Sequence, residues 1–225
     1  MAGTNEEDVS MIEAVIFDMD GVISNTLPIH TGAESKVLLR YGIRVLPQEI
    51  IQEFNGVPDR VTFETLFKRF NRKLDLQQVQ EEKWELFQKL AKDGIPAIPG
   101  SLEFINILLA NKFTLGLASS APLRIINLVI DSLRIKEKFQ AVVCTEEVQH
   151  GKPAPDIFLL AAKQLNVEPQ NCVVIEDAAS GIQAARSAGM RCIAIATAHK
   201  REELEGADKI VDNFSELTIE GIKNL

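Results

Sequence analysis

Cysteine is scarce in this chain, and the three that occur are Cys144, Cys172 and Cys192. Each lies inside an apolar run rich in β-branched residues, and their spacing does not match that of a metal site. An odd, scattered set argues against a disulfide framework or a thiolate zinc site, because both need paired or closely spaced thiols. We therefore expect reduced cysteines that serve as small core residues.

Long apolar segments and an excess of basic residues are also missing. No uninterrupted apolar stretch approaches the roughly 20 residues that cross a bilayer. The net charge is −8, from 24 basic and 32 acidic residues, whereas nucleic acids and anionic membranes usually meet a basic face. We expect neither as a partner. An anionic small molecule stays compatible with this charge, because a site can be locally positive.

The first ten residues, MAGTNEEDVS, lack the apolar segment of a secretory signal and the basic character of a transit peptide. We expect residues 1–10 to be a disordered lead-in, and the protein to be cytoplasmic. Nothing in the sequence demands an oligomer, so a monomer or weak oligomer is expected.

Short apolar segments alternate with helical patterns along most of the chain, which predicts βαβ units and a parallel sheet covered by helices on both faces. The expected strands are Ala14–Phe17, Thr114–Ala118, Ala141–Cys144, Cys172–Ile175, Cys192–Ala196 and, more weakly, Lys209–Val211. The expected helices between them include 102–110, 125–133, 157–165 and 181–188. The fold class is therefore α/β, with a Rossmann-like, doubly wound parallel sheet.

Residues 27–94 interrupt this alternation, because they contain amphipathic helical patterns and no convincing strand. Prolines and glycines flank this stretch at 24–28 and 94–100, where they would interrupt a helix. We predict an inserted α-helical cap domain over 27–94 and a Rossmann-like core formed by 11–26 and 95–225.

The segment AVIFDMDGVISNT, residues 14–26, carries the strongest chemical signal. An apolar strand ends in Asp18 and Asp20, and Gly21 then lets the backbone turn. Two like charges 4 Å apart repel by about 4 kcal/mol at an effective dielectric of 20, so such a pair indicates a cation or a reaction unless it is a solvated acidic turn. A calcium loop fits poorly, because Val22 and Ile23 stand where an oxygen ligand and a glycine are needed.

Polar residues follow three further strands: Ser119 and Ser120, Lys152, and the pair Glu176 and Asp177. Alone, each has an ordinary explanation as a helix cap, a solvated charge or a partner of a helix dipole. Parallel strands bring their carboxyl ends to one edge, so together they form a site with four acids, a lysine and hydroxyls. Carboxylates suit Mg²⁺, and a lysine with hydroxyls suits a phosphoryl group.

Four motifs in this order resemble the haloacid dehalogenase superfamily, in the branch with a helical cap that includes β-phosphoglucomutases and many sugar-phosphate phosphatases. The motifs are DMDG at 18–21, Ser119 in LASS, Lys152 in GKPAPDIF, and IEDAASGIQAARSAGM at 175–190. The resemblance covers almost the whole chain, and each motif follows an expected strand.

The resemblance implies a role for each motif residue. Asp18 would be the nucleophile that forms an aspartyl-phosphate, and Asp20 the general acid and base. A larger set would bind the phosphoryl group and Mg²⁺: Gly21, Ser119, Ser120 and Lys152 for the former, and Asp18, the main-chain carbonyl of Asp20, Asp177 and Glu176 for the latter.

In the cap, the resemblance suggests His30, Arg60 and Lys83 as substrate-binding residues. Asp59 stands where β-phosphoglucomutases place a phosphate-gripping arginine, with Arg60 one residue later in a segment that resembles the substrate-facing loop of the cap. Asn25 replaces a common aspartate, which bears on the support of Asp20.

These features favour a Mg²⁺-dependent phosphatase acting on a small phosphorylated metabolite, such as a sugar phosphate. A hexose-phosphate mutase is the main alternative. A phosphonatase would need a cap lysine, for which Lys36 and Lys83 are available. A non-catalytic binding protein is disfavoured, because both aspartates of the first motif are intact.

Overall fold

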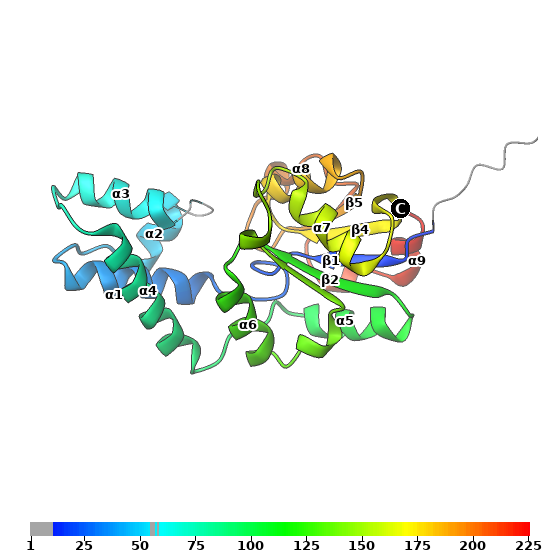
Figure 1. Cartoon of the computed structure of the whole chain (residues 1–225), viewed down its shortest axis with the longest axis horizontal. Helices are drawn as coiled ribbons and strands as arrows, with labels where there is room; N and C mark the ends of the chain where they lie inside the picture. The colour runs from blue at the N-terminus through cyan, green and yellow to red at the C-terminus, as the bar shows by residue number, and fades with distance from the viewer. Residues whose placement is uncertain (1–10, 55–56, 58) are drawn as a thin grey trace, which may run out of the picture. The chain divides into compact units, whose positions relative to one another are not determined.

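The computed structural model describes residues 11–54, 57 and 59–225 of the chain (Figure 1). The described residues up to Asn25 form one compact unit with Ala97–Leu225, and Thr26–Pro96 form a second. The expected lead-in at 1–10 lies outside the described residues, as do Asn55, Gly56 and Pro58 of the segment interpreted as a cap loop.

The first unit contains a six-stranded sheet in which every neighbouring pair is parallel. Its strands are β1 (Ala14–Phe17), β2 (Thr114–Ser119), β3 (Ala141–Cys144), β4 (Cys172–Glu176), β5 (Arg191–Ile195) and β6 (Lys209–Val211). The strand order is β3-β2-β1-β4-β5-β6, which confirms the predicted doubly wound α/β fold. Two expected site residues, Ser119 and Glu176, are the last residues of their strands and do not follow them.

Helices cover both faces of this sheet: α7 and α8 lie on one side and α5 and α6 on the other (Figure 1). Alternate strand residues such as Ile16 and Val174 are fully buried in the cluster formed with α7 and α8. Burying one such side chain contributes about 1.5–3 kcal/mol. The α-helices are α5 (Ser101–Ala110), α6 (Leu123–Ser132), α7 (Asp156–Leu165), α8 (Ala179–Ser187) and α9 (Ile219–Lys223), with 3₁₀ turns at Lys136–Lys138, Thr145–Glu147, Pro169–Asn171, Arg201–Leu204 and Phe214–Glu216.

The second unit is helical, with α1 (Leu27–Arg40), α2 (Pro47–Phe54), α3 (Asp59–Arg69) and α4 (Leu76–Ala91). It has an apolar core of its own, in which Leu38, Phe63 and Val79 are fully buried. Asp59 and Arg60 belong to the first turn of α3, so part of the segment interpreted as a loop is helical.

The three cysteines are free and buried, as expected. Burial raises the pKa of the Cys144 thiol to about 11 and that of Cys172 to about 12, so these thiols stay protonated near neutral pH.

Within the described part of the chain, no helix combines the length and the apolar character that crossing a membrane requires.

The strand order places a topological switch point between β1 and β4. From β1 the chain builds outward through β2 to β3, and then returns to the other side of β1 to add β4, β5 and β6. In open parallel sheets, ligands bind at the carboxyl ends of the strands beside such a reversal. The candidate site therefore lies where β1 and β4 end.

Candidate active site

The turn after β1 is held by its own backbone. The Asp18 N–H donates to the carbonyl of Ile175 at 2.9 Å, which continues the β1–β4 pairing as far as the first acid. Beyond it, the Gly21 N–H donates to the Ser24 carbonyl at 2.8 Å, and the Ser24 N–H donates to the Met19 carbonyl at 2.9 Å. These bonds fix the backbone on which Asp18 and Asp20 stand.

Gly21 is needed in this turn for two reasons. Its φ of +80° lies in the left-handed region that side chains disfavour, and a Cβ there would come within 1.9 Å of Asp177 Oδ2. The Thr197 hydroxyl donates to the Gly21 carbonyl at 2.5 Å, which ties the turn to the residues after β5. Thr197 was not among the expected site residues, although it follows a strand as the others do.

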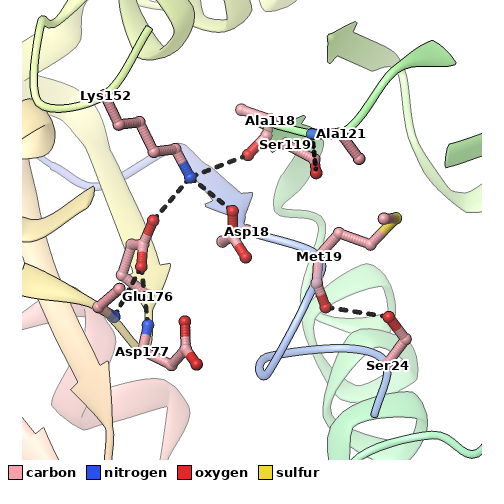
Figure 2. A network of polar contacts seen from close by, with 10 residues as sticks. Asp18, Met19, Ser24, Ala118, Ser119, Ala121, Lys152, Glu176 and Asp177 are labelled. Atoms are coloured by element: carbon pink, nitrogen blue, oxygen red, sulfur yellow. Dashed lines mark hydrogen bonds and ion pairs between the residues drawn. The ribbon is translucent and has the colours of Figure 1, made fainter. Parts of the chain in front are cut away.

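Lys152 connects the ends of β1, β2 and β4 (Figure 2). Its ammonium lies 2.5 Å from Asp18 Oδ1 and 2.6 Å from Glu176 Oε1, and it donates to the Ala118 carbonyl at 3.3 Å. The side chains of Lys152, Asp18 and Glu176 are 5%, 10% and 2% exposed, so these ion pairs are shielded from water. The structure therefore brings together three of the expected site residues.

The site holds more negative than positive charge. Burial raises the pKa of Asp18 to about 7, against the attraction of Lys152 and with the repulsion of Glu176 and Asp20. Burial likewise raises the pKa of Asp177 well above its usual value, and Glu176 and Asp18 add to the rise. Lys152 is the cation that offsets these acids, and the ion pairs with Asp18 and Glu176 raise its pKa despite burial. A further cation would relieve the repulsion among the carboxylates.

The residues present fit Mg²⁺ as the resemblance implies. Asp18 and Asp177 offer carboxylate oxygens and Asp20 a main-chain carbonyl, which are the hard ligands that Mg²⁺ uses together with waters and substrate oxygens. Among the described residues, no group of three or more His, Cys, Asp or Glu side chains is arranged as a complete metal site. The protein side chains would therefore supply only part of the coordination.

The two serines after β2 differ in their surroundings. Ser119 is 1% exposed and its Oγ accepts a hydrogen bond from the Ala121 N–H at 3.0 Å (Figure 2). Ser120 is exposed in the turn that follows. Asn25, in place of the aspartate common in the resembling branch, is exposed as well.

In the helical unit, the structure brings His30 and Lys83 together. The Lys83 ammonium donates to His30 Nδ1 at 2.8 Å, and it lies 2.6 Å from Asp59 Oδ2 and 3.5 Å from Glu34 Oε1. Arg60 is exposed, and its Nε donates to Glu64 Oε1 at 2.9 Å. The expected cap residues are therefore not one cluster: Lys83 and His30 share one, and Arg60 belongs to a surface ion pair.

Burial shifts the pKa values of this cap cluster. It lowers the pKa of His30 to about 3, helped by Lys83, and raises that of Glu34 to about 7 against the attraction of Lys83. Burial also acts to raise the pKa of Asp59, but Lys83 outweighs it and the pKa lies below its usual value. The sequence carried one signal for Glu34, its position one turn after His30 on the same helix face.

A parallel α/β unit with a carboxylate and lysine centre at its switch point, joined to a helical unit inserted after the first strand, is the architecture of a haloacid dehalogenase-like protein. Residues 15–195 match the haloacid dehalogenase-like hydrolase family. The chain belongs to this family of enzymes, as the motifs predicted.

Individual relatives agree with this assignment. The chain is 36% identical to a phosphorylated carbohydrates phosphatase of Thermotoga maritima, over 81% of this chain and 84% of that protein. It is 34% identical to fructose-1-phosphate phosphatase YqaB of Escherichia coli, over 80% and 94%. The crystal structure of β-phosphoglucomutase from Clostridium difficile superposes with a TM-score of 0.79 at 31% identity, covering 95% and 96% of the two chains.

Proposed function

We propose that this protein is a Mg²⁺-dependent phosphohydrolase that removes phosphate from a small phosphorylated metabolite, of the sugar-phosphate class, through an aspartyl-phosphate intermediate. The observation that carries the proposal is Lys152, which is buried between Asp18 and Glu176 beside Asp177 at the switch point. Two curated relatives are named as phosphatases of phosphorylated carbohydrates and of fructose 1-phosphate, which supports the substrate class.

In the first step, an oxygen of Asp18 attacks phosphorus and the bond from phosphorus to the ester oxygen breaks. Asp20 gives a proton to the departing oxygen, so the alcohol leaves neutral. Lys152 and Ser119 hold the phosphoryl oxygens, and the ammonium stabilises the charge that they carry in the transition state. Asp18 is then esterified to phosphate.

In the second step, Asp20 takes a proton from water as the water oxygen attacks phosphorus. The bond from phosphorus to Asp18 breaks, inorganic phosphate is released, and the free Asp18 carboxylate is restored. Asp18, Asp177 and the Asp20 carbonyl would hold Mg²⁺, which would supply positive charge that offsets both the acids and the phosphoryl group.

The test of this function is a panel of phosphorylated metabolites incubated with the purified full chain and Mg²⁺. Release of inorganic phosphate from sugar phosphates supports the proposal, and its loss on chelation of the metal supports the Mg²⁺ dependence. Isomerisation without phosphate release would identify a mutase. Absence of both reactions, with retained binding of a phosphorylated metabolite, would identify a binding protein.

The mutase deserves a separate test, because a β-phosphoglucomutase superposes on this chain and because His30 and Lys83 are in contact. His30→Ala is expected to leave phosphate release within about threefold of the wild type, since hydrolysis needs no aligned second hydroxyl. A mutase needs its sugar hydroxyl oriented, and misplacement of a reacting group can cost about 10²-fold. If His30→Ala lowers the isomerisation rate by about 10²-fold, measured in a coupled isomerase assay with a bisphosphate activator, the mutase is favoured.

The pairing of Lys83 weakens the alternatives that depend on this cap cation. The Lys83 ammonium is already paired with Asp59 and Glu34, whereas Lys36 is exposed. A phosphonatase needs an amine that can form a Schiff base, and a mutase needs cations for a second phosphate. Arg60 differs from His30 and Lys83 because its side chain is exposed and pairs with Glu64 at the surface.

Following the resemblance, we propose that Arg60 and Lys83 influence substrate choice. Arg60→Ala is expected to raise KM for the preferred metabolite by about tenfold while kcat stays near its wild-type value, because binding lost at a remote group appears in KM. The KM for p-nitrophenyl phosphate, which lacks the sugar, should not change.

Glu64→Ala is the matched control, since it breaks the same surface ion pair and leaves the guanidinium in place. If Arg60→Ala, Lys83→Met and Glu64→Ala all act equally on both substrates, the cap does not select through these residues.

The cytoplasmic location and the monomeric or weakly oligomeric state stay predictions.

A further inference from the structure

The Glu176 carboxylate, at the end of β4, is 1% exposed and uses both of its oxygens within the protein (Figure 2). Oε1 accepts from the Lys152 ammonium at 2.6 Å. Oε2 accepts from the N–H groups of Asp177 at 2.8 Å and Ala178 at 3.0 Å. All three partners are donors, so the position requires an acceptor at both oxygens.

The absence of a side chain at Gly181, in the first turn of α8, creates the space for this carboxylate. A Cβ at Gly181 would come within 1.7 Å of Glu176 Oε1 and 2.0 Å of its Cδ, distances that no real Cβ contact shows. Gly32, also within a helix, is a useful contrast, because the nearest atom to a Cβ there would be Leu90 Cδ1 at an ordinary 3.6 Å. The φ of Gly181 lies outside the positive range, so the constraint is one of space.

The contacts of Glu176 bear on its role toward the metal. For Glu176 to bind a metal ion through Oε1, the Lys152 ammonium would have to leave its 2.6 Å contact, and through Oε2 two backbone N–H groups would lose their acceptor. Asp18 Oδ1 and the Ala118 carbonyl complete the acceptors around the ammonium. Glu176 is thus one of the three hydrogen-bond acceptors that place the charge of Lys152, and it orders the turn that carries Asp177.

We propose that Glu176, in the space left by Gly181, is a positioning residue that fixes the Lys152 ammonium for the phosphoryl group and does not bind Mg²⁺ directly. This proposal differs from the expectation that Glu176 shares the metal with Asp177, and it rests on the proposed phosphoryl-transfer function.

The first experiment measures Mg²⁺ binding to the metal-free full chain by isothermal titration calorimetry, with no substrate present. Loss of a residue that supports a metal ligand typically costs about 10- to 100-fold in affinity. Glu176→Gln is expected at the low end, about tenfold, because Asp177 stays in place, whereas Asp177→Asn should abolish measurable binding. An equal loss in both variants would overturn the proposal.

The second experiment tests whether Glu176 acts through Lys152. Binding of inorganic phosphate at saturating Mg²⁺ is measured for the wild type, Glu176→Gln, Lys152→Ala and the double variant. If the glutamate acts by placing the ammonium, the double variant binds phosphate no more weakly than Lys152→Ala alone. Two losses that multiply would show independent roles and would overturn the proposal.

Gly181→Ala provides a variant in which Glu176 keeps its charge but cannot occupy its position. We expect kcat/KM for p-nitrophenyl phosphate to fall by about tenfold or more, with Mg²⁺ affinity close to that of Glu176→Gln. Gly32→Ala is the control and should match the wild type. Circular dichroism checks that each variant folds. A folded Gly181→Ala variant with wild-type kcat/KM would contradict the proposal. If Gly181→Ala does not fold, the Glu176→Gln experiments decide.

These measurements separate the inference from the proposed function. If the wild type hydrolyses no phosphate ester, the proposed function fails, and the two binding experiments still test Glu176. If hydrolysis is found and Glu176→Gln loses Mg²⁺ as Asp177→Asn does, the function stands and the inference fails.

Discussion

Asp18→Asn is expected to abolish phosphoryl transfer and to leave the fold intact. An amide is a poor nucleophile and a poorer Mg²⁺ ligand than a carboxylate, so both steps that use Asp18 are lost. The fold should survive, because burial and the neighbouring acids raise the pKa of Asp18 and so oppose its charge, and because Glu176 still pairs with Lys152. The rate with p-nitrophenyl phosphate should fall to background, and the thermal unfolding midpoint should not fall.

The matched control for this variant is Asp131→Asn on α6, where the side chain is 59% exposed and pairs loosely with Lys136 at 4.0 Å. It removes the same charge and is expected to leave turnover unchanged. Acid-quenched reactions with labelled substrate provide the direct readout, since a phosphoryl group attached to protein should appear in the wild type and be absent in Asp18→Asn. Near-normal turnover in Asp18→Asn would rule out the proposed nucleophile.

Asp20→Asn is expected to lower kcat for a sugar phosphate by about 10²–10⁴-fold, which is the usual contribution of general acid and base catalysis to the rate. The effect should depend on the leaving group. p-Nitrophenolate departs without a proton, so the first step with p-nitrophenyl phosphate should be slowed little, while water attack on the aspartyl-phosphate still lacks its base. A burst of p-nitrophenol followed by slow turnover is therefore expected.

Rapid-quench kinetics measure this burst, and its amplitude should approach one equivalent per enzyme. An unchanged steady-state rate with the sugar phosphate would exclude Asp20 as the proton carrier. Equal slowing of both steps with p-nitrophenyl phosphate would instead point to a positional effect, such as displacement of the Asp20 main-chain carbonyl from the metal.

The fold could be predicted from local patterns. Each strand of a covered parallel sheet must be apolar on both faces, so a run such as Ala14–Phe17 is visible in the sequence. The order of runs and helices then implies the doubly wound sheet, and the carboxyl ends of its strands meet at one edge. For this reason Asp18, Lys152 and Asp177 could be assigned to one region before any contact was known.

The pairing of these groups could not be predicted, because it depends on contacts between residues far apart in the chain. Lys152 and Asp18 are separated by 134 residues and lie 2.5 Å apart. The sequence offered Glu176 and Asp177 as two similar acids. Only the tertiary structure shows that Glu176 faces Lys152 and two backbone N–H groups, and that Gly181 leaves it the room.

The helical unit shows the same division. Its amphipathic helices were evident from their periodicity, and His30 and Lys83 were singled out by resemblance. Whether a cap cation is available to a ligand depends on its neighbours, and those come from different helices: Lys83 of α4 is paired with Asp59 of α3 and Glu34 of α1. Sequence by itself determined the elements and the chemical groups at their ends, because both follow from local periodicity and strand direction. The tertiary structure decided which charges neutralise one another, because ion pairing depends on distances that only the packed chain sets.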